Sequence, residues 1–217
     1  MSNIVKLYNS LNSYVSRAVL VIPTAFTLFI RVKFSDWKAA GYQSIIGNGN
    51  AGAWDTMLYR IMGNDKLRAH VTTNPSGIMS FDSATGVIPN RWYHITMIWN
   101  RPNLNLYFDA LMDTNAINRN EPIAGFNTAW YIGYDGRPAV YSPEMVISEA
   151  QLYNRALSQN EIRYNYEHTN NPIKNGLMFN YTQDSIYGAT WVDLVAGANG
   201  TYVNGAVPVV ANRLAGR

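Results

Sequence analysis

Residues 148–162 read SEAQLYNRALSQNEI, and this stretch decides the fold. Its first half continues a β-strand that alternation predicts over 145–153. Its second half begins a helix at Ser158, because the Ser158 hydroxyl can accept the backbone N–H of Glu161 while the Glu161 side chain returns the bond. The stretch therefore predicts a strand that leads into one short, capped helix near 158–167.

Most of the remaining chain alternates with period two, the pattern of strands with one buried face. Apolar side chains alternate over 26–34 and 92–99, and a turn at 100–103 leads into a returning strand that ends at Phe108. Pro102 fixes φ in that turn, and the flanking Asn residues tolerate unusual backbone angles. Further strands are predicted at 42–46, 56–62, 66–72, 77–81, 129–134, 145–153 and 176–182. Short strands separated by Asn-, Gly- and Asp-rich turns predict an all-β sandwich.

Composition narrows the class of protein. The 217 residues suit one domain, and they include no cysteine, so disulfides and thiolate metal sites are excluded. Only 14% of residues are charged, with a net charge of +3, and Lys and Arg are scattered, so we expect no nucleic-acid partner. The apolar run 18–30 is interrupted by Pro23 and alternates onward to Phe34. It predicts two buried strands rather than a signal peptide or a membrane-inserted segment.

Taken in order, these motifs resemble the laminin-G-like domains of the concanavalin A-like lectin and glucanase superfamily. The family's closing signature is a strand that runs into YNRALS, here 153–158, and then a Ser-led helix. AFTLFIRVKF at 25–34 resembles its first long core strand, and RWYHITMIWN at 91–100 resembles the first strand of its hairpin. The resemblance implies a jelly-roll sandwich of two antiparallel sheets. Where the family usually has Asp-Gly after the hairpin, this chain has Asp109-Ala110, so the turn is expected to differ.

The order of the domain also departs from the family. A segment like 176–205 usually opens a laminin-G-like domain, whereas here it comes last. We therefore expect one permuted domain over 18–217, preceded by an N-terminal extension over 1–17. Because the termini of such sandwiches lie close together, the last strands can close the chain's own sheets. The alternative is exchange of these strands with a neighbouring subunit, which would build a homo-oligomer.

Enzyme signatures are missing from the sequence. It has no His-Glu-x-x-His pair, no Gly-x-Ser-x-Gly elbow and no glycine-rich phosphate loop. Glycoside hydrolysis is the enzymatic alternative, because related sandwiches carry glucanases, and it needs two carboxylates about 5–9.5 Å apart. No acidic-x-acidic triplet occurs, and Glu144 and Glu149 fall on opposite faces of a regular strand. We expect a non-catalytic protein.

The resemblance implies a calcium ion at the rim of the sandwich in many relatives. The matching positions are Asp193 and, more loosely, Glu149. Calcium takes six to eight oxygen ligands, and the sequence around both positions supplies too few. We therefore expect no cofactor, with Asp193 capping a turn and Glu149 solvated on a strand.

Two loops combine aromatic and polar residues in the way that sugar-binding sites do. A ring can stack on the C–H face of a sugar while amides and carboxylates bind its hydroxyls. The candidates for ligand binding are Asn48, Asn50, Trp54 and Asp55 in the first loop, and Tyr134, Asp135 and Arg137 in the second. The structural alternative is that Trp54 folds over the edge of the core.

Two hypotheses for function remain, both of them binding roles. In one, the chain is a structural or decoration protein on the surface of an assembly such as a virion, with lectin-like adhesive capacity. It would act at the virion surface or outside the cell after release, and would meet glycans, cell-surface proteins or capsid proteins. In the other, it is a stand-alone carbohydrate-binding lectin.

Overall fold

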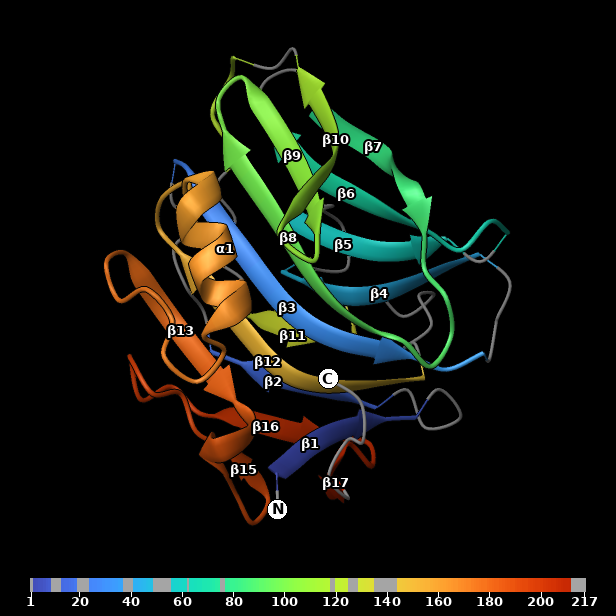
Figure 1. Cartoon of the computed structure of the whole chain (residues 1–217), viewed down its shortest axis with the longest axis vertical. Coiled ribbons are helices and arrows are strands. Elements are labelled where there is room, and N and C mark those ends of the chain that lie inside the picture. Colours follow the sequence, from blue (N-terminus) through green and yellow to red (C-terminus); the bar gives the residue numbers. More distant parts are fainter. Residues whose placement is uncertain are drawn as a thin grey trace.

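Two antiparallel β-sheets face each other across one apolar core, and one helix lies across the outer face of the first sheet (Figure 1). The computed structural model describes residues 2–8, 13–18, 24–36, 41–48, 56–61, 63–74, 77–117, 120–124, 129–134 and 144–211. This architecture confirms the all-β sandwich with a single short helix over the described residues.

The first sheet contains the two long central strands β3 and β12. In spatial order its strands are β10 (Leu111–Ile117), β9 (Asn103–Phe108), β8 (Trp92–Asn100), β3 (Phe26–Phe34), β12 (Met145–Tyr153), β1 (Ser2–Leu7) and β17 (Val207–Ala211). Strand β13 (Leu177–Thr182) pairs with the later part of β12.

The second sheet packs behind the first. Its order is β14 (Ile186–Tyr187), β15 (Thr190–Trp191), β16 (Gly200–Val203), β2 (Tyr14–Arg17), β11 (Trp130–Ile132), β4 (Tyr42–Gly47), β5 (Thr56–Ile61), β6 (Lys66–Thr73) and β7 (Gly77–Gly86). A short 3₁₀ turn, Gln183–Ser185, links β13 to β14.

The core confirms the predicted alternation. Alternate residues of β3, β8 and β9 all point between the sheets and are buried: Phe26, Leu28, Ile30, Val32 and Phe34; Tyr93, Ile95, Met97 and Trp99; Leu104, Leu106 and Phe108. The sequence favours core positions for Trp92, Trp99 and Trp130, and Trp99 and Trp130 do belong to this core. Trp92 does not: it is half-buried on the outer face of the first sheet, so its assignment to the core is wrong.

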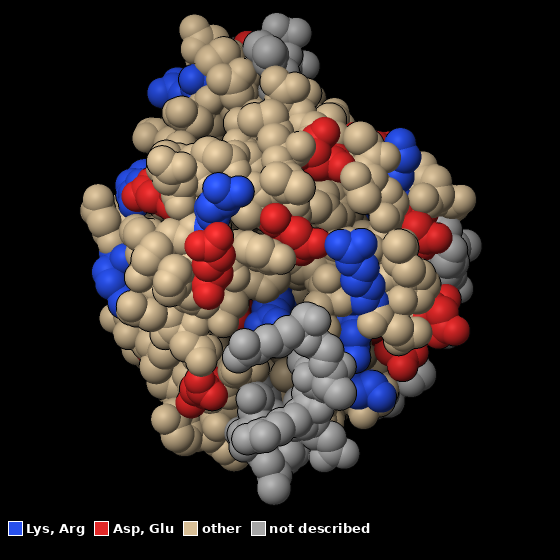
Figure 2. All heavy atoms as spheres, in the orientation of Figure 1, with Lys and Arg blue, Asp and Glu red and all other residues tan. Residues whose placement is uncertain are grey.

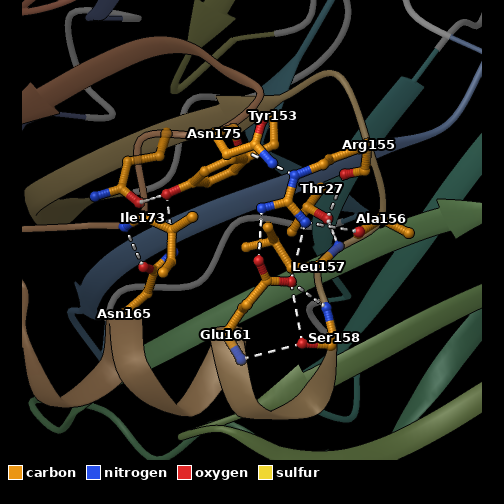
Figure 3. A network of polar contacts seen from close by, with 11 residues as sticks. Thr27, Tyr153, Arg155, Ala156, Leu157, Ser158, Glu161, Asn165, Ile173 and Asn175 are labelled. Carbon is orange, nitrogen blue, oxygen red and sulfur yellow. Dashed lines mark hydrogen bonds and ion pairs between the residues drawn. The ribbon is translucent and has the colours of Figure 1, made fainter.

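Helix α1 (Gln159–Glu167) begins where the sequence predicts (Figure 3). Ser158 Oγ accepts from the backbone N–H of Glu161, and the Glu161 carboxylate accepts from the backbone N–H of Ser158. Arg155 donates two further hydrogen bonds to this carboxylate, at 2.9 and 2.6 Å. Ile162 then packs into a small apolar cluster between the helix and the first sheet. The YNRALS signature thus fixes how the helix leaves β12.

The end of the helix is tied back to the sheet by Asn165 (Figure 3). Its Nδ2 donates to the Tyr153 hydroxyl at 2.9 Å, and its Oδ1 accepts from the backbone N–H of Ile173 at 2.9 Å. Because Asn165 is buried, these bonds satisfy a polar group that would otherwise destabilise the interface.

The N-terminal residues correct the predicted domain boundary. Residues 2–7 form β1, which pairs with both β12 and β17, and residues 14–17 form β2 inside the second sheet. They are integral strands rather than an extension. Within the single chain, the C-terminal strands pair with β12, β2 and β1.

Two local irregularities also differ from regular strand geometry. A β-bulge in β12 lies between Ile147 and Glu149, so Ile147 and Ala150 both point into the core. The turn from β9 to β10 places Asp109 and Ala110 at φ of 49° and 64°. Two consecutive positive φ values are typical of a tight hairpin turn, which explains why the family prefers glycine at the second position.

Candidate functional site

Three tyrosines gather on the outer face of the second sheet. Tyr14 comes from β2, Tyr131 from β11 and Tyr134 from the segment that follows β11. The rings of Tyr14 and Tyr134 are stacked with centroids 4.8 Å apart, and Tyr131 meets both edge-on, at 5.7 and 5.5 Å. All three side chains are half-buried, so part of this tyrosine cluster remains in contact with solvent.

Strand pairing builds the cluster. Val15, Trp130 and Ile132 point into the core, so their neighbours Tyr14 and Tyr131 must point outward. Strands β2 and β11 are adjacent, which brings the two rings together. Burial and the nearby Tyr14 raise the pKa of Tyr131, so its hydroxyl stays protonated and able to donate at neutral pH.

Gly133 positions the third ring. Its φ is +88°, its N–H donates to the Ile45 carbonyl, and a Cβ here would overlap the Leu7 side chain. Glycine suits this turn because its backbone conformation strains an L side chain, and any side chain here would also displace Leu7. The turn directs Tyr134 onto Tyr14.

Hydroxyl groups flank the tyrosine cluster on the neighbouring strands. Ser16 of β2 lies opposite Tyr131 on one side and opposite Thr201 of β16 on the other. Thr201 is exposed. The surface thus presents aromatic rings beside small hydrogen-bonding groups.

The described first residues of the two predicted loops lie apart. Strands β4 and β11 run antiparallel, with Gly47 opposite Tyr131, so the chain leaves β4 at one end of the pair and leaves β11 at the other. Of the predicted residues, Tyr134 joins the tyrosine cluster. Asn48 is buried, and its Oδ1 accepts from the backbone N–H of Thr56 at 3.0 Å, closing the β4–β5 hairpin instead of facing solvent. Asn50, Trp54, Asp55, Asp135 and Arg137 lie outside the described residues.

Asp193 holds the end of the chain together. Its Oδ2 forms an ion pair with Arg17 at 3.0 Å, and its Oδ1 accepts from the backbone N–H groups of Asn180 and Val195, both at 3.0 Å. The side chains of Asp193 and Arg17 are both buried. With its lone pairs directed at these donors, Asp193 links the second sheet to β13, and it does cap a local turn through Val195.

Glu149 is buried rather than solvated, which corrects the sequence-based expectation. It points to the outer face of the first sheet, where Arg31 lies 3.5 Å away, and burial raises its pKa to about 7 although Arg31 and Thr169 oppose the shift. His94 of β8 lies opposite Arg31 of β3. Burial, together with the Arg31 charge, lowers the pKa of His94 to about 3. Asp193 faces the core and Glu149 faces outward. Among the described residues, no three His, Cys, Asp or Glu side chains gather as a metal site.

The geometry also bears on glycoside hydrolysis. The sequence predicts Glu144 and Glu149 on opposite faces of the strand. The bulge in β12 shifts the alternation by one residue and so places both on the same face. Five residues of extended chain nevertheless separate their Cα atoms by about 16 Å. Side chains on one face of a strand stand roughly parallel, so the two carboxyl groups do not close this gap to the roughly 5–9.5 Å that glycosidase mechanisms use.

A groove that the sequence did not indicate surrounds the tip of the β9–β10 hairpin. Its volume is about 540 Å³, and it is lined by Thr85, Arg91, Tyr93, Phe108, Asp109, Leu111, Met112, Asp113 and Tyr166. Leu111, Met112 and Tyr166 are exposed there. The Asp109 carboxylate accepts hydrogen bonds from the Arg91 side chain and the His94 backbone N–H. The Asp113 carboxylate accepts from the backbone N–H groups of Ala84 and Thr85 and from the Thr114 hydroxyl. The only sequence feature noted at this place was Asp109-Ala110 in a position where the family has Asp-Gly. It predicts a different turn conformation but not a groove.

With the two sheets, the signature helix and the hairpin in place, the family can be tested against known sequences. A family model described as the concanavalin A-like lectin/glucanases superfamily, in its laminin-G-like form, matches residues 9–163. The chain belongs to this superfamily. No protein of curated function matches the laminin-G-like chain in sequence.

Solved structures confirm the fold. A protein of Bacteroides ovatus ATCC 8483 to which carbohydrate binding is attributed aligns over 96% of this chain with a TM-score of 0.69 and 17% identity. The laminin-G-like chain spans only 60% of that protein. A heptameric SAP-like pentraxin of Limulus polyphemus aligns over 97% of this chain and 95% of its own, with a TM-score of 0.66 and 12% identity.

A third similar structure is the binding domain of botulinum neurotoxin serotype G. It aligns over 76% of this chain and 42% of its own, with a TM-score of 0.58 and 15% identity. At these identities the likeness establishes a shared sandwich architecture. Over the described residues, no helix has the length and apolar character needed to cross a membrane.

Proposed function

We propose that this laminin-G-like chain is a non-catalytic carbohydrate-binding module whose ligand contacts the tyrosine cluster of Tyr14, Tyr131 and Tyr134. The observation that carries the proposal is the packing of three half-buried rings on an outer sheet face, beside the Ser16 and Thr201 hydroxyls. The carbohydrate binding attributed to the Bacteroides ovatus protein of similar fold supports the same class of ligand.

Tyrosine suits this role for physical reasons. It offers a large, rigid apolar face with few rotatable bonds and a hydroxyl at its tip, so little conformational entropy is lost on binding. Mutual stacking holds Tyr14 and Tyr134 in place before the ligand arrives. A preorganised aromatic surface loses less free energy to ordering than a flexible one.

The absence of catalysis is part of the proposal. Glu144 and Glu149 are too far apart to act together, and Glu149 is buried against Arg31.

The direct test is a glycan array probed with the intact chain and with two variants, Tyr14→Ala and Tyr134→Ala. We expect one glycan class to bind, and each variant to lose at least fivefold in affinity, since hot-spot aromatics contribute 1 kcal/mol or more. Tyr187→Ala is the matched control, because Tyr187 is exposed on β14 away from the cluster. Met112→Ser probes the hairpin groove; loss of binding confined to this variant would move the site there and contradict the proposal.

We further propose that the module works on the surface of an assembly such as a virion, or outside the cell after release, meeting glycans or capsid proteins. A chain without cysteine folds independently of the redox compartment, which suits a protein made in one compartment and used in another. The solution mass distinguishes the two forms of the proposal. A particle-building protein forms a defined oligomer, whereas a stand-alone lectin is monomeric and binds sugar.

A further inference from the structure

A second hollow lies at the end of the first sheet, whereas the tyrosine cluster lies on the second sheet. It has a volume of about 250 Å³, and its lining residues are Lys6, Lys33, Phe34, Ser35, Asn90, Glu144, Met145 and Val146. We call it the basic pocket. Its volume is below the roughly 300–1,000 Å³ of typical ligand pockets, so it suits one charged group with part of a sugar ring rather than an oligosaccharide.

Strand register places the two lysines side by side. Lys6 of β1 and Lys33 of β3 both lie opposite Val146 of the intervening β12. Their chain neighbours point into the core, so both lysines and Val146 point to the outer face. Two strand spacings separate the lysine Cα atoms by about 10 Å, a span that two flexible ammonium groups can close around one anion.

The two ammonium groups are held by aromatic rings rather than by carboxylates. Lys6 Nζ lies 4.7 Å from the centre of the Tyr8 ring, and Lys33 Nζ lies 5.5 Å from that of Trp92. Over the described part of the chain, neither lysine forms an ion pair with Asp or Glu. Both lysines are half-buried, so their positive charge is less screened than at an open surface.

The surroundings reinforce the positive charge. Arg31 also lies over the Trp92 ring, at 5.5 Å. In Figure 2, which shows the face that carries α1, a column of Lys and Arg side chains runs down the right of the centre. Glu144 is the opposing charge, because it lines the basic pocket without reaching ion-pair distance of either lysine.

We infer that the basic pocket binds the anionic group of an acidic sugar, a carboxylate or a sulfate, with Lys6 and Lys33 as its ligands. The anion is bound by two ammonium groups, and the outward-facing side chain of Val146, which lies between the two lysines, is the apolar wall that contacts the ring carrying the anion. The identification of the carrier as a sugar rests on the proposed function, whereas the anion site rests on the lysine pair alone. Glu144 weakens anion binding by repulsion and thereby limits it to ligands that also contact the wall.

The test is isothermal titration calorimetry of the intact chain with a sulfated heparin tetrasaccharide, with tetragalacturonate as the carboxylate ligand, and with neutral cellotetraose. We expect one of the two anionic ligands to bind more tightly than cellotetraose and to weaken as salt rises from 50 to 300 mM. Lys6→Gln and Lys33→Gln should each lower the affinity for that ligand at least fivefold. Glu144→Gln should raise it about two- to fivefold, in the opposite direction to the lysine variants.

Two outcomes overturn the inference. One is equal binding of charged and neutral ligands; the other is anion binding that the lysine variants leave unchanged while thermal melts show every variant folded. Tyr14→Ala separates this inference from the proposed function, because it should remove neutral-glycan binding and leave the anion contribution of the lysines intact. Loss of all anion binding in Tyr14→Ala, with none in Lys33→Gln, would exclude the basic pocket and keep the tyrosine cluster.

Discussion

Ala110 is strained in the hairpin turn of this chain. Its φ of 64° lies in the left-handed region, which costs an L-residue about 1–2 kcal/mol, whereas glycine adopts it freely. The methyl group is buried, and its loss offsets part of the gain. We predict that Ala110→Gly raises the free energy of unfolding by about 0.5–1 kcal/mol, measured by urea titration.

Ala84→Gly is the matched control for this prediction. Ala84 lies within β7 and does not have a positive φ, so glycine there should lower stability by about 0.5–1 kcal/mol. An Ala110→Gly variant that is less stable than the natural chain would show that the buried methyl outweighs the backbone strain.

Glu149 should make stability depend on pH in an unusual direction. Burial raises its pKa to about 7, while Arg31 and Thr169 oppose the shift, so between pH 4.5 and 7 the folded chain holds a proton that the unfolded chain releases. Stability from this group is therefore present below pH 4.5 and lost as pH rises through 7. The unfolding free energy of Glu149→Gln relative to the natural chain should rise by on the order of 2 kcal/mol as the pH increases from 4.5 to 8.

His94 changes the pH dependence of stability in the opposite direction, but it is present in both the natural chain and the Glu149→Gln variant. Its pKa is lowered to about 3, so the unfolded chain binds the extra proton between pH 3 and 6.5 and stability falls as pH falls. Chemical denaturation of both chains at several pH values measures the difference. A constant difference from pH 4.5 to 8 would mean that Glu149 titrates normally.

At the scale of elements, helix α1 depends on one carboxylate. Hydrogen bonds from Arg155, and then from Ser158, lower the pKa of Glu161 to about 2. Glu161→Gln should reduce the unfolding free energy by about 1–2 kcal/mol at pH 7. The substitution weakens the helix cap and removes the charge from the bidentate hydrogen bonds with Arg155. Ser158→Ala removes only the cap and should cost about 1 kcal/mol.

The cost of Glu161→Gln should disappear in acid. The folded pKa is depressed, so the stabilisation is present above the unfolded pKa near 4.3 and lost as pH falls towards 2. Melting temperatures of the two chains should converge over this interval. A difference that persists at pH 2 would assign the effect to packing instead.

Elements with a strong local pattern could be predicted from the sequence. The alternation of 26–34 and 92–108 and the capping box at Ser158 each determine one face or one boundary, and all three were confirmed. Strands β1 and β2 were missed because residues 1–17 precede the motifs that resemble the family and were expected to form an extension. The bulge beside Ser148 was missed because it arises from the mismatch between paired strands.

The candidate site was predictable only in part for the same reason. Tyr134 was singled out because it follows a core strand in a glycine-rich segment, but its partner Tyr14 came from residues that were expected to form an extension. The side-by-side placement of Lys6 and Lys33 likewise depends on β1 pairing with β12. Long-range register of this kind is not encoded within a short window of sequence.

At the scale of the molecule, the Arg17–Asp193 ion pair ties β2 to the segment after β15, and Asp193 also accepts from the backbone of Asn180 in β13 of the first sheet. Both side chains are buried, so removing one charge leaves the other uncompensated. We predict that Asp193→Asn lowers the unfolding free energy by about 3–5 kcal/mol, measured by chemical denaturation. Arg17→Met combined with Asp193→Asn should recover part of the loss. A loss below 1 kcal/mol in the single variant would show that the pair is not important for closure.

The central claim is that a glycan binds at the tyrosine cluster, and mapping the bound ligand by NMR tests it most directly. A glycan selected from the array would be titrated into isotope-labelled chain while backbone amide shifts are recorded. The account predicts that the largest shifts fall on residues 14–16, 131–134 and 200–203, with little change in helix α1. Largest shifts at Leu111–Asp113 instead, with the tyrosine amides unmoved, would contradict it.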